Sequence, residues 1–423
     1  MGSLEMHGLE IEGGIPLRGD IYVSGAKNAA LPLLATGLMC DGTLTLTHVP
    51  DLADTRLMIE LLAHHGLDIG FQDGRVSMSG PATNMDAPYD LVSKMRASIL
   101  VLGPLLARYG EARVSLPGGC AIGTRPVDLH IRAMQKLGAT VELADGYIQA
   151  RAPKGLTGNK IVFPFVSVGA TENAMMAAAC ASGTSQIVNA AREPEIIDLA
   201  DCLNAMGARI TGQGTDTLTI EGVASLSTAT HRVVADRVEA GTFIMAAAMT
   251  GGSLTVRDII PHHLDVLFDV MRQTGVGIDI GDNFVTVSAN GRYQAQNVET
   301  QPYPGFPTDL QAQFTAMMCL AEGVSQISET IFENRFMHVP ELVRMGADIS
   351  VDGRTAIIRG KDALLPAPVM ATDLRASVSL VLAGLATTGT TSVSRIYHLD
   401  RGYAGLETKL GACGARLRRI HQS

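Results

Sequence analysis

Hydrophobic and polar positions along the chain follow a repeat of about 70 residues. Each repeat has an apolar helical stretch, a glycine and a short β-rich run, then an amphipathic helical stretch that ends at a second glycine before two further strands. The second glycines are Gly66, Gly138, Gly207, Gly275, Gly346 and Gly414. A glycine there is typical of a helix C-terminus, because the residue after the last turn adopts a left-handed conformation. The pattern predicts six similar α/β units that fill the chain.

The apolar stretches indicate buried helices. Segments such as 172–180 and 240–249 are rich in Ala, Gly and Met on most faces, which is typical of a helix surrounded by protein. Two helices and several strands per unit favour a small α/β layer over a common solenoid, whose repeats reach about 50 residues. A Ser/Thr/Ala-rich stretch at 223–230 follows the third unit. We therefore expect two domains of three units each.

Composition disfavours several classes of protein. The 423 residues include 33 Lys and Arg against 42 Asp and Glu, a net charge of −9, so the chain lacks the basic surface of a general nucleic-acid binder. The longest apolar run, 97–107, contains Ser and Gly and is shorter than the roughly 18–20 residues of a membrane span. Six cysteines lie far apart without metal-ligand spacing. We expect a reduced, cytoplasmic protein without a resident metal.

Charged and small polar residues collect just before the predicted helices. They are Lys27, Asn28, Arg96, Ser167, Val168, Gly169, Asp236, Thr308, Asp309 and Arg375 before the apolar stretches, and Cys120, Arg125, Glu193, Arg335 and Arg401 before the amphipathic ones. Both helices of a unit should therefore start at the same end. Helix N-termini present free N–H groups and a positive dipole end, which suit phosphate or carboxylate. The pattern predicts an anionic ligand.

These residues also have purely structural interpretations. Asp236 and Asp309 could simply cap helices, and Arg375, close to Asp373, could form an ion pair at a helix terminus. Lys27 lies in a loop of small residues, where a lysine is more often solvated than catalytic. The residue pattern alone leaves both interpretations open.

Cys120 differs from the other five cysteines, which lie in or beside helical stretches. It follows two glycines and precedes Arg125 by five residues. A nearby cation lowers the pKa of a thiol and favours the reactive thiolate, although an incidental loop cysteine explains the pattern equally well. The chain contains no GxxxxGK[ST], GxGxxG or GxSxG motif, which disfavours ATP, dinucleotide and serine-hydrolase chemistry.

Longer motifs point to a known family. The chain contains SGAKNAALPLL, LPGGCAIGTRPVDLH, SVGATEN, FPTDLQAQF, ENRFMHVPEL, ATDLRAS and RIYHLDRGY. These closely resemble the UDP-N-acetylglucosamine 1-carboxyvinyltransferases, the bacterial UDP-GlcNAc enolpyruvyl transferases, from about Gly13 to Leu417. The resemblance implies an α/β (α+β) fold of two inside-out α/β barrels. Each barrel has three βαβαββ repeats, with helices inside and sheets outside.

The resemblance also implies how the chain is divided. Residues 26–232 form a first three-repeat domain that carries the Cys120 loop. Residues 1–25 together with 233–423 form a second domain that carries Asp309 and Arg401. The N-terminal strand is expected to complete the C-terminal domain, and the active site is expected in the cleft between the two domains.

The implied reaction transfers the enolpyruvyl group of phosphoenolpyruvate to the 3′-hydroxyl of UDP-N-acetylglucosamine and releases phosphate, the first committed step of peptidoglycan synthesis. The sugar hydroxyl adds to C2 of the enol while C3 is protonated, and the tetrahedral intermediate then loses a C3 proton and phosphate. Such chemistry needs an acid, a base and cations over phosphate and carboxylate. It implies no metal or organic cofactor and no nucleic-acid or membrane partner. A monomer is favoured.

The same resemblance assigns expected roles to individual residues. Phosphoenolpyruvate is expected to contact Lys27, Asn28, Cys120, Arg125 and Arg401. The catalytic residues are expected to be Cys120, Asp309, Lys27 and Arg401, with Asp309 handling the proton of the sugar hydroxyl and Cys120 acting as general acid or in product release. UDP-N-acetylglucosamine is expected to contact Asn28, Arg96, Arg125, Pro126, Val127, Asp128, Leu129, Ser167, Val168, Gly169, Thr308, Asp309, Ile331 and Phe332. Glu193, Asp236, Arg335 and Arg375 are expected in supporting roles.

One position departs from the family pattern, and two other functions compete. Phe165 stands where some members have a lysine that contacts the diphosphate, so diphosphate binding should depend more on Arg125 and the backbone. The first rival is the related transferase that acts on shikimate 3-phosphate, and the second is a non-catalytic regulatory paralogue. The presence of Lys27, Cys120 and Asp309 together with Arg401 favours an active enzyme. Cys120 also predicts sensitivity to fosfomycin, which alkylates the thiol at this place.

Overall fold

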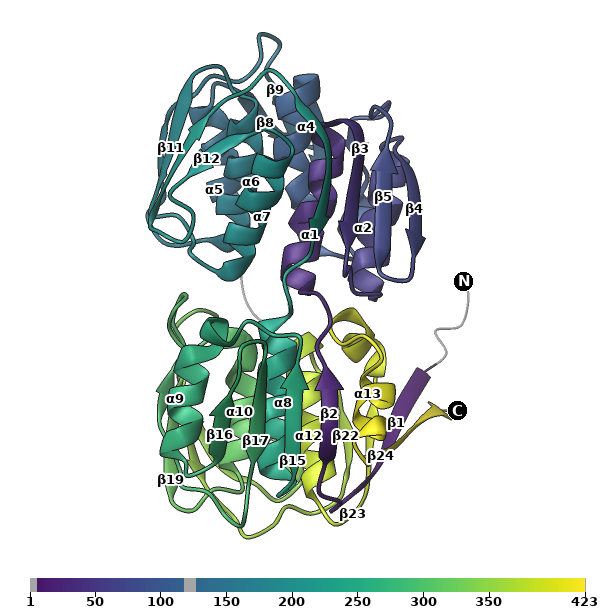
Figure 1. Ribbon diagram of the computed structural model, residues 1–423, viewed down its shortest axis with the longest axis vertical. Helices are drawn as coiled ribbons and strands as arrows, with labels where there is room; N and C mark the ends of the chain where they lie inside the picture. The colour runs from purple at the N-terminus through teal and green to yellow at the C-terminus, as the bar shows by residue number, and fades with distance from the viewer. Residues whose placement is uncertain (1–5, 118–126, 423) are drawn as a thin grey trace. The chain divides into compact units, whose positions relative to one another are not determined.

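The computed structural model describes residues 6–117 and 127–422, which divide into two compact units (Figure 1). The first unit contains residues 25–117 and 127–234, and the second contains residues 6–24 and 235–422. Each unit has a hydrophobic core of its own, built mainly from Ala, Leu, Ile, Val and Met. The chain passes from the second unit to the first after Ser24 and returns after Val234.

The first unit has 21 described elements in chain order. They are α1 (Lys27–Ala35), η1 (Thr36–Met39), β3 (Cys40–Thr47), α2 (Ala53–His64), β4 (Asp68–Gln72), β5 (Arg75–Ser79), β6 (Asp86–Ala87), α3 (Tyr89–Val92), η2 (Arg96–Val101), α4 (Leu102–Tyr109), β7 (Glu111–Ser115), α5 (Asp128–Lys136), β8 (Thr140–Ala144), β9 (Tyr147–Arg151), β10 (Lys160–Val162), α6 (Val168–Ala179), β11 (Thr184–Val188), α7 (Pro194–Ala205), β12 (Arg209–Thr211), β13 (Thr217–Glu221) and β14 (Leu226–Arg232).

The second unit also has 21 described elements. They are β1 (Met6–Gly13), β2 (Arg18–Tyr22), α8 (Arg237–Met249), β15 (Ser253–Arg257), η3 (Pro261–Leu264), α9 (Asp265–Gln273), β16 (Gly277–Ile280), β17 (Phe284–Ser288), β18 (Val298–Glu299), η4 (Thr308–Leu310), α10 (Gln311–Met318), β19 (Val324–Ser328), α11 (Val339–Arg344), β20 (Asp348–Asp352), β21 (Thr355–Arg359), β22 (Pro368–Met370), α12 (Leu374–Ala386), β23 (Gly389–Ser394), η5 (Ile396–Arg401), α13 (Leu406–Ala412) and β24 (Arg416–Gln422).

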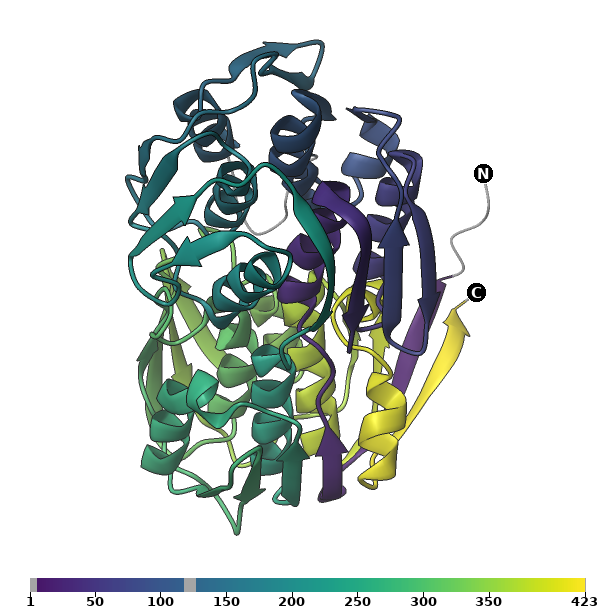
Figure 2. The same cartoon turned by 45° about the horizontal axis from the view of Figure 1, so that its top comes forward.

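The apolar helices are buried on all sides, as their composition predicts. In α6 every residue from Ala170 to Ala179 is buried, and in α8 every residue from Val238 to Met249. Small side chains such as Ala and Gly let neighbouring helices approach closely, so α8, α10 and α12 pack against one another inside the second unit. Figures 1 and 2 show the sheets of each unit on the outside of these helices.

The described residues form six four-stranded sheets, and all six share one pattern of parallel and antiparallel pairing. In β10-β11-β13-β12, β10 runs parallel to β11, and the remaining neighbours are antiparallel. Helices α6 and α7 follow the two parallel strands, so both begin at the same edge of the sheet, as predicted. The prediction of helices inside and sheets outside is confirmed. The strands of the described residues form separate sheets and no closed β-barrel, which agrees with an inside-out arrangement whose centre is filled by helices.

Three strands pair with strands that are distant from them in the sequence. β2 pairs in parallel with β15 of the second unit, although the next helix, α1, belongs to the first unit. β14 pairs in parallel with β3 and so completes the first sheet of the first unit. β1 lies between β23 and β24 and is antiparallel to both, which supplies the fourth strand of the last sheet. The expected crossing of the N-terminal strand is therefore present.

The six repeat glycines adopt the predicted left-handed conformation. Their φ angles lie between 89° and 110° at Gly66, Gly138, Gly207, Gly275, Gly346 and Gly414. Open space surrounds four of these positions, so the backbone conformation and not crowding favours glycine there. Among the described residues, no helix combines the length and the apolarity needed to cross a membrane.

Candidate active site

Asp309 lies in η4 and is held by two buried arginines of the second unit. Its Oδ1 accepts a hydrogen bond from Arg335 Nη2 at 2.6 Å, and its Oδ2 lies 3.3 Å from Arg375 Nε. The arginine side chains are only 6% and 3% exposed, whereas that of Asp309 is 21% exposed. Asp309 therefore keeps a solvent-facing surface while both of its oxygens are bound. Such a carboxylate is fixed in orientation and can still reach a ligand.

Thr308, the neighbour of Asp309, belongs to the same hydrogen-bond network. Its hydroxyl accepts from Arg335 Nη1 at 2.9 Å and donates to Glu329 Oε2 at 2.8 Å. Glu329 is buried, and its Oε1 accepts from the backbone N–H groups of Ile331 and Phe332 at 2.9 and 3.0 Å. The expected contact residues 308, 309, 331 and 332 are thus brought together, but the two N–H groups of 331–332 already have a carboxylate partner.

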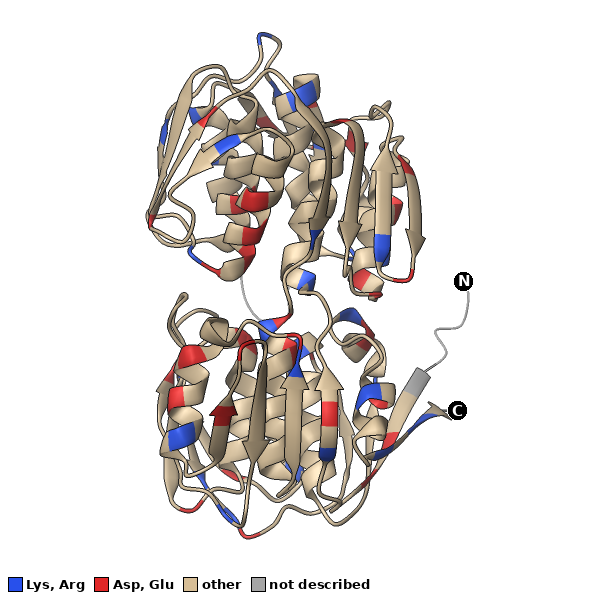
Figure 3. Cartoon of the chain, in the orientation of Figure 1, with Lys and Arg blue, Asp and Glu red and all other residues tan. Residues whose placement is uncertain are grey.

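Aspartates cap two central helices of this unit. Asp236 Oδ1 accepts from the N–H groups of Val238 and Glu239 at the start of α8, and Asp373 Oδ1 accepts from those of Arg375 and Ala376 at the start of α12. The capping interpretation is therefore correct for Asp236. It is wrong for Asp309, whose carboxylate is ion-paired, and Arg375 pairs with Asp309 instead of a residue of its own helix. Figure 3 shows charged residues where α8 begins and none along its middle.

Arg375 and Arg401 both belong to the same end of the second unit. Burial opposes the charge of Arg375, but Asp309, Tyr403 and Asp236 outweigh it and raise the pKa of its guanidinium, whose carbon lies 5.5 Å from the Tyr403 ring centre. Arg401 is half-buried at the end of η5. The pKa of His398 is lowered mainly by burial and further by the charge of Arg401. Buried His338 has its pKa lowered to about 4, mainly by desolvation. The imidazole of His338 is therefore neutral at physiological pH.

Lys27 is the first residue of α1 in the first unit and is only 6% exposed. Its ammonium lies 3.3 Å from Asp54 Oδ2, and that carboxylate belongs to the start of α2. The solvated interpretation of Lys27 is therefore wrong. Asn28 follows it on α1 and is half-buried. A buried, paired ammonium at a helix start is suited to bind an anion with little reorganisation.

The starts of α5 and α6 lie close together in the first unit. Ser167 caps α6 by accepting from Ala170 N at 3.4 Å, and a Cβ on Gly169 would lie 3.4 Å from the His130 ring. His130 lies in α5, and burial, followed by the charge of Arg96, lowers its pKa to about 4. Among the expected nucleotide contacts, the structure thus brings together Arg96, Val127, Asp128, Leu129, Ser167, Val168 and Gly169. The imidazole of His130 is therefore neutral at physiological pH and places no second positive charge beside Arg96.

Glu193 precedes α7 and belongs to a group of three carboxylates. Burial raises the pKa of Glu172 well above its ordinary value, and Glu195 and Glu193 add to the effect. Glu193 Oε2 also accepts from the N–H of Arg192 at 3.0 Å. The carboxyl of Glu172 is therefore held in its protonated form to higher pH than an ordinary glutamate.

Cys120, Arg125 and Pro126 lie outside the described residues. The other five cysteines are free thiols, and burial raises the pKa of each. For Cys180 the pKa is about 11, and for Cys202 and Cys319 it is about 12. These five thiols are accordingly almost entirely un-ionised at neutral pH, which fits the sequence interpretation of them as small hydrophobic residues.

Some partners of the candidate residues carry no clear sequence signal. Asp54, Glu329 and Tyr403 are ordinary residues of a helix start, a strand end and a loop. Each gains its importance from a segment distant in sequence. Asp373 had a weak signal, because an acid before a predicted helix suggests a cap.

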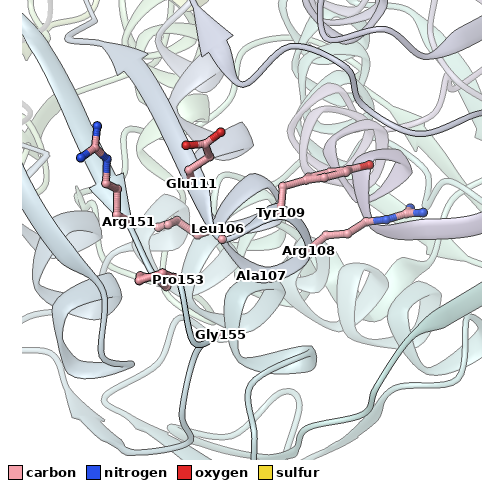
Figure 4. A pocket seen from close by; sticks show the side chains of 10 residues that line it. Leu106, Ala107, Arg108, Tyr109, Glu111, Arg151, Pro153 and Gly155 are labelled. Atoms are coloured by element: carbon pink, nitrogen blue, oxygen red, sulfur yellow. The ribbon is translucent and has the colours of Figure 1, made fainter.

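A surface pocket of about 400 Å³ lies elsewhere on the first unit, where α4 ends and β7 and β9 run (Figure 4). Its lining is Leu106, Ala107, Arg108, Tyr109, Gly110, Glu111, Arg151, Ala152, Pro153 and Gly155. None of these is a candidate residue. The pocket adjoins the C-terminal end of α4, and Arg108, Arg151 and Glu111 are among its lining residues. Most of the expected site residues lie instead at helix N-termini.

Comparison with known proteins identifies the family of the chain. The EPSP synthase (3-phosphoshikimate 1-carboxyvinyltransferase) family model matches residues 11–410. A UDP-N-acetylglucosamine 1-carboxyvinyltransferase from Gluconacetobacter diazotrophicus is 57% identical over 415 residues, covering 97% of this chain and 99% of the relative. One of the same name from Acidiphilium cryptum is 57% identical over 416 residues, covering 98% and 100%.

Solved structures share the fold. The enolpyruvyl transferase NikO from Streptomyces tendae superposes with a TM-score of 0.88 at 25% identity, covering 99% of this chain and 100% of that one. An EPSP synthase from Acinetobacter baumannii has a TM-score of 0.75 at 17% identity, covering 98% and 100%, and supports the fold alone. With a family model over nearly the whole chain and relatives more than half identical to it, the chain belongs to the UDP-N-acetylglucosamine 1-carboxyvinyltransferase family, within the wider EPSP synthase family.

Proposed function

We propose that this protein is a transferase that moves the enolpyruvyl group of phosphoenolpyruvate to the 3′-hydroxyl of UDP-N-acetylglucosamine and releases phosphate, at the start of peptidoglycan synthesis. Full-length identity of 57% to relatives named for this transfer carries the proposal. The Asp309 cluster supports it, because addition of a hydroxyl to an enol requires a positioned base. Both substrates are small anionic molecules, which suits the charged helix N-termini.

Asp309 is the proposed base for the sugar hydroxyl. Arg335 and Arg375 bind its two oxygens, which keeps the carboxylate in one orientation. As the hydroxyl adds to C2 of phosphoenolpyruvate, its proton passes to a carboxylate oxygen. The paired arginines restrain the carboxylate before the reaction, so little reorganisation is needed at that moment.

Lys27, Arg125 and Arg401 are the proposed cations for phosphoenolpyruvate. Lys27 is already buried beside Asp54, so its ammonium is fixed in place before the substrate binds. These charges stabilise the negative charge that develops on the carboxylate and phosphate of the tetrahedral intermediate. Cys120 is the proposed acid for C3 or an aid to product release, and Asn28 is proposed to hold the tetrahedral centre.

UDP-N-acetylglucosamine is proposed to bind where α5 and α6 begin. The first N–H groups of α6, after Ser167, suit a diphosphate, and Arg96 adds positive charge nearby. Phe165 is 57% exposed and provides no charge, so backbone N–H groups and Arg125 carry the proposed diphosphate contact. Thr308 and the 331–332 segment are proposed near the sugar. Glu193 and Asp236 are proposed in supporting roles.

We also infer that the protein acts in the cytoplasm as a monomer. The substrates it is proposed to use are cytoplasmic metabolites, and each described unit has a complete core of its own. Light scattering at micromolar concentration, with and without both substrates, tests the oligomeric state. A mass of one chain, 44.6 kDa, is expected, and a stable larger species would contradict the inference.

The central experiment measures phosphate release from phosphoenolpyruvate with UDP-N-acetylglucosamine and, in parallel, with shikimate 3-phosphate. Release with the nucleotide sugar alone, abolished by fosfomycin, is the expected result. Release with shikimate 3-phosphate alone would reassign the acceptor within the same fold. If the protein binds the nucleotide sugar but releases no phosphate with either acceptor, the result would favour a regulatory paralogue. A Cys120→Asp variant should retain turnover and resist fosfomycin.

A further inference from the structure

A partly buried hydrogen-bond junction surrounds Ser24, the last residue of the second unit before the chain passes into the first. The Ser24 N–H donates to Glu239 Oε2 at 2.6 Å, and its carbonyl accepts from Asp236 N at 2.8 Å. Lys409 Nζ donates to the Ser24 hydroxyl and to Glu239 Oε1, both at 2.6 Å. Every polar group of Ser24 is therefore bound. We call Ser24, Glu239 and Lys409 the Ser24 junction.

The Ser24 junction is built from charged groups that are costly to bury. Glu239 is 2% exposed and lies on α8, and Lys409 is on α13 with a side chain 21% exposed. Burial raises the pKa of Glu239, which the nearby Lys409 opposes. Replacing one partner would leave the other buried without its counter-charge. Such an arrangement fixes three chain segments, 22–24, α8 and α13, to one another.

The residues after Ser24 lead directly to Lys27. A Cβ on Gly25 would lie 1.8 Å from the His48 carbonyl oxygen, and Ala26 N donates to Val234 O at 2.7 Å. Each position from Ser24 to Lys27 is therefore held by packing or hydrogen bonds.

Lys409 connects the same junction to the segment that carries Arg401. Its N–H donates to Gly405 O at 2.9 Å at the start of α13. Between them, the Tyr403 hydroxyl lies 3.1 Å from Thr242 Oγ1 of α8, which fixes the chain from 401 to 409 against that helix. The Ser24 junction is therefore linked through α13 and Tyr403 to the segment of Arg401, one of the cations proposed for phosphoenolpyruvate.

From these contacts we propose that Glu239 and Lys409 are positioning residues for phosphoenolpyruvate. By holding α13, they set the position of Arg401 without touching the substrate themselves. This inference rests on the proposed function. It goes beyond the family assignment, because neither residue lies in the motifs that identify the family site.

The test compares Lys409→Met, Glu239→Gln and Ser24→Ala in the phosphate-release assay. The KM for phosphoenolpyruvate should rise about tenfold in the first two variants and about threefold in the third, while the KM for UDP-N-acetylglucosamine changes less than about twofold. Ser24→Ala removes one hydroxyl and keeps the backbone contacts, so it should fold even if the charge variants do not. Amide exchange in peptides covering 18–30 should become faster in Glu239→Gln, because the Ser24 N–H loses a charged acceptor.

Tyr293→Phe is the matched control. Its hydroxyl donates to Met317 O at 2.9 Å in the core of the same unit, away from Ser24 and from the candidate site. It should lower stability without separating the two KM values. Equal changes in both KM values in the junction variants, or an unchanged KM for phosphoenolpyruvate in Ser24→Ala and Lys409→Met, would overturn the inference. Absence of turnover in the unsubstituted protein would overturn the proposed function itself, so the two failures are distinguishable.

Discussion

At the residue scale, Asp309 has little freedom because two guanidinium groups occupy its two oxygens. Arg335 also binds Thr308, so the four side chains form one network in which the Asp309 carboxylate stays partly exposed. Removing the carboxylate charge leaves two buried arginines without their counter-ion. The role of Asp309 in the reaction and its role in the local structure are therefore separable only by a substitution that keeps its shape.

Asp309→Asn should lower kcat at least about 100-fold, because an amide cannot accept the hydroxyl proton. The Kd for UDP-N-acetylglucosamine should change less than about threefold, since the amide oxygen still accepts a hydrogen bond. Steady-state kinetics and calorimetric titration measure the two effects. Asp20→Asn, which alters an exposed pair with Arg257 on β15, is the control and should leave kcat unchanged. Near-normal turnover in Asp309→Asn would remove this residue from the mechanism.

Glu172→Gln should stabilise the protein, increasingly so as pH rises. The pKa of Glu172 in the folded state is raised by burial and by its acidic neighbours above the ordinary value of 4.5. The folded state then holds a proton that the unfolded state has lost, so the wild type loses stability as pH rises above 4.5. Glutamine has no such proton to lose. Urea unfolding at pH 5 and pH 8 measures the difference, and an equal effect at both pH values would contradict the assignment.

The chemical types at the site are readable from the sequence, but their partners are not. Asp309 and Arg375 each stand before a predicted helix, where an anion site and a helix cap look alike. Only the fold shows that Arg375 pairs with an aspartate 66 residues away. For Lys27, the local small residues suggest solvent exposure, whereas tertiary packing buries it beside Asp54. Long-range pairing overrides the local pattern in both cases.

At the scale of elements, the repeat glycines end the amphipathic helices, and the central helices are alanine-rich. Both features are predictable, because a left-handed C-terminal residue and an all-round apolar composition are local properties of sequence. The short strands β6 and β18, of two residues each, carry too little pattern to be predicted. They exist because a neighbouring strand already supplies the hydrogen-bonding edge.

Gly414→Ala and Gly411→Ala should have opposite effects on stability. Gly414 has a φ of 96° and open space around it, so alanine should cost about 1 kcal/mol through backbone strain alone. Gly411 lies inside α13, also with open space, and alanine there should stabilise by about 0.5–1 kcal/mol. Chemical denaturation of the two variants measures the signs. Stabilisation by both would show that the left-handed conformation at 414 is not required.

At the scale of the whole molecule, the order of strands in the sheets departs from their order in the chain. The sixth sheet needs β1, and the first sheet of the first unit needs β14. The six-fold periodicity predicts the number of sheets, but periodicity holds no information on which copy of a strand enters which sheet. The crossing of β1 was expected from family resemblance and not from the residue pattern.

Leu9→Thr with Ile11→Thr should destabilise the second unit, whereas Glu10→Thr with Glu12→Thr should not. Leu9 and Ile11 are fully buried in β1, while the two glutamates alternate with them on the outer face. Loss of the two apolar side chains should cost several kcal/mol, roughly 2–4 for each. Thermal unfolding combined with limited proteolysis identifies the unit affected. Equal destabilisation by both pairs would argue that β1 contributes its backbone alone.

The position of β1 between β23 and β24 has a consequence for synthesis of the chain. The first unit is complete once residue 234 has left the ribosome, so it can fold while translation continues. β1 is made first and must wait for the last two strands, which follow roughly 375 residues later, or about 20–75 s at typical translation rates. Leu9 and Ile11 are buried in the folded protein, but throughout that interval the strands with which β1 pairs do not yet exist. The earliest strand to be made is thus among the last to be protected, and a ribosome stalled before residue 389 leaves a folded first unit beside an unpaired, aggregation-prone strand.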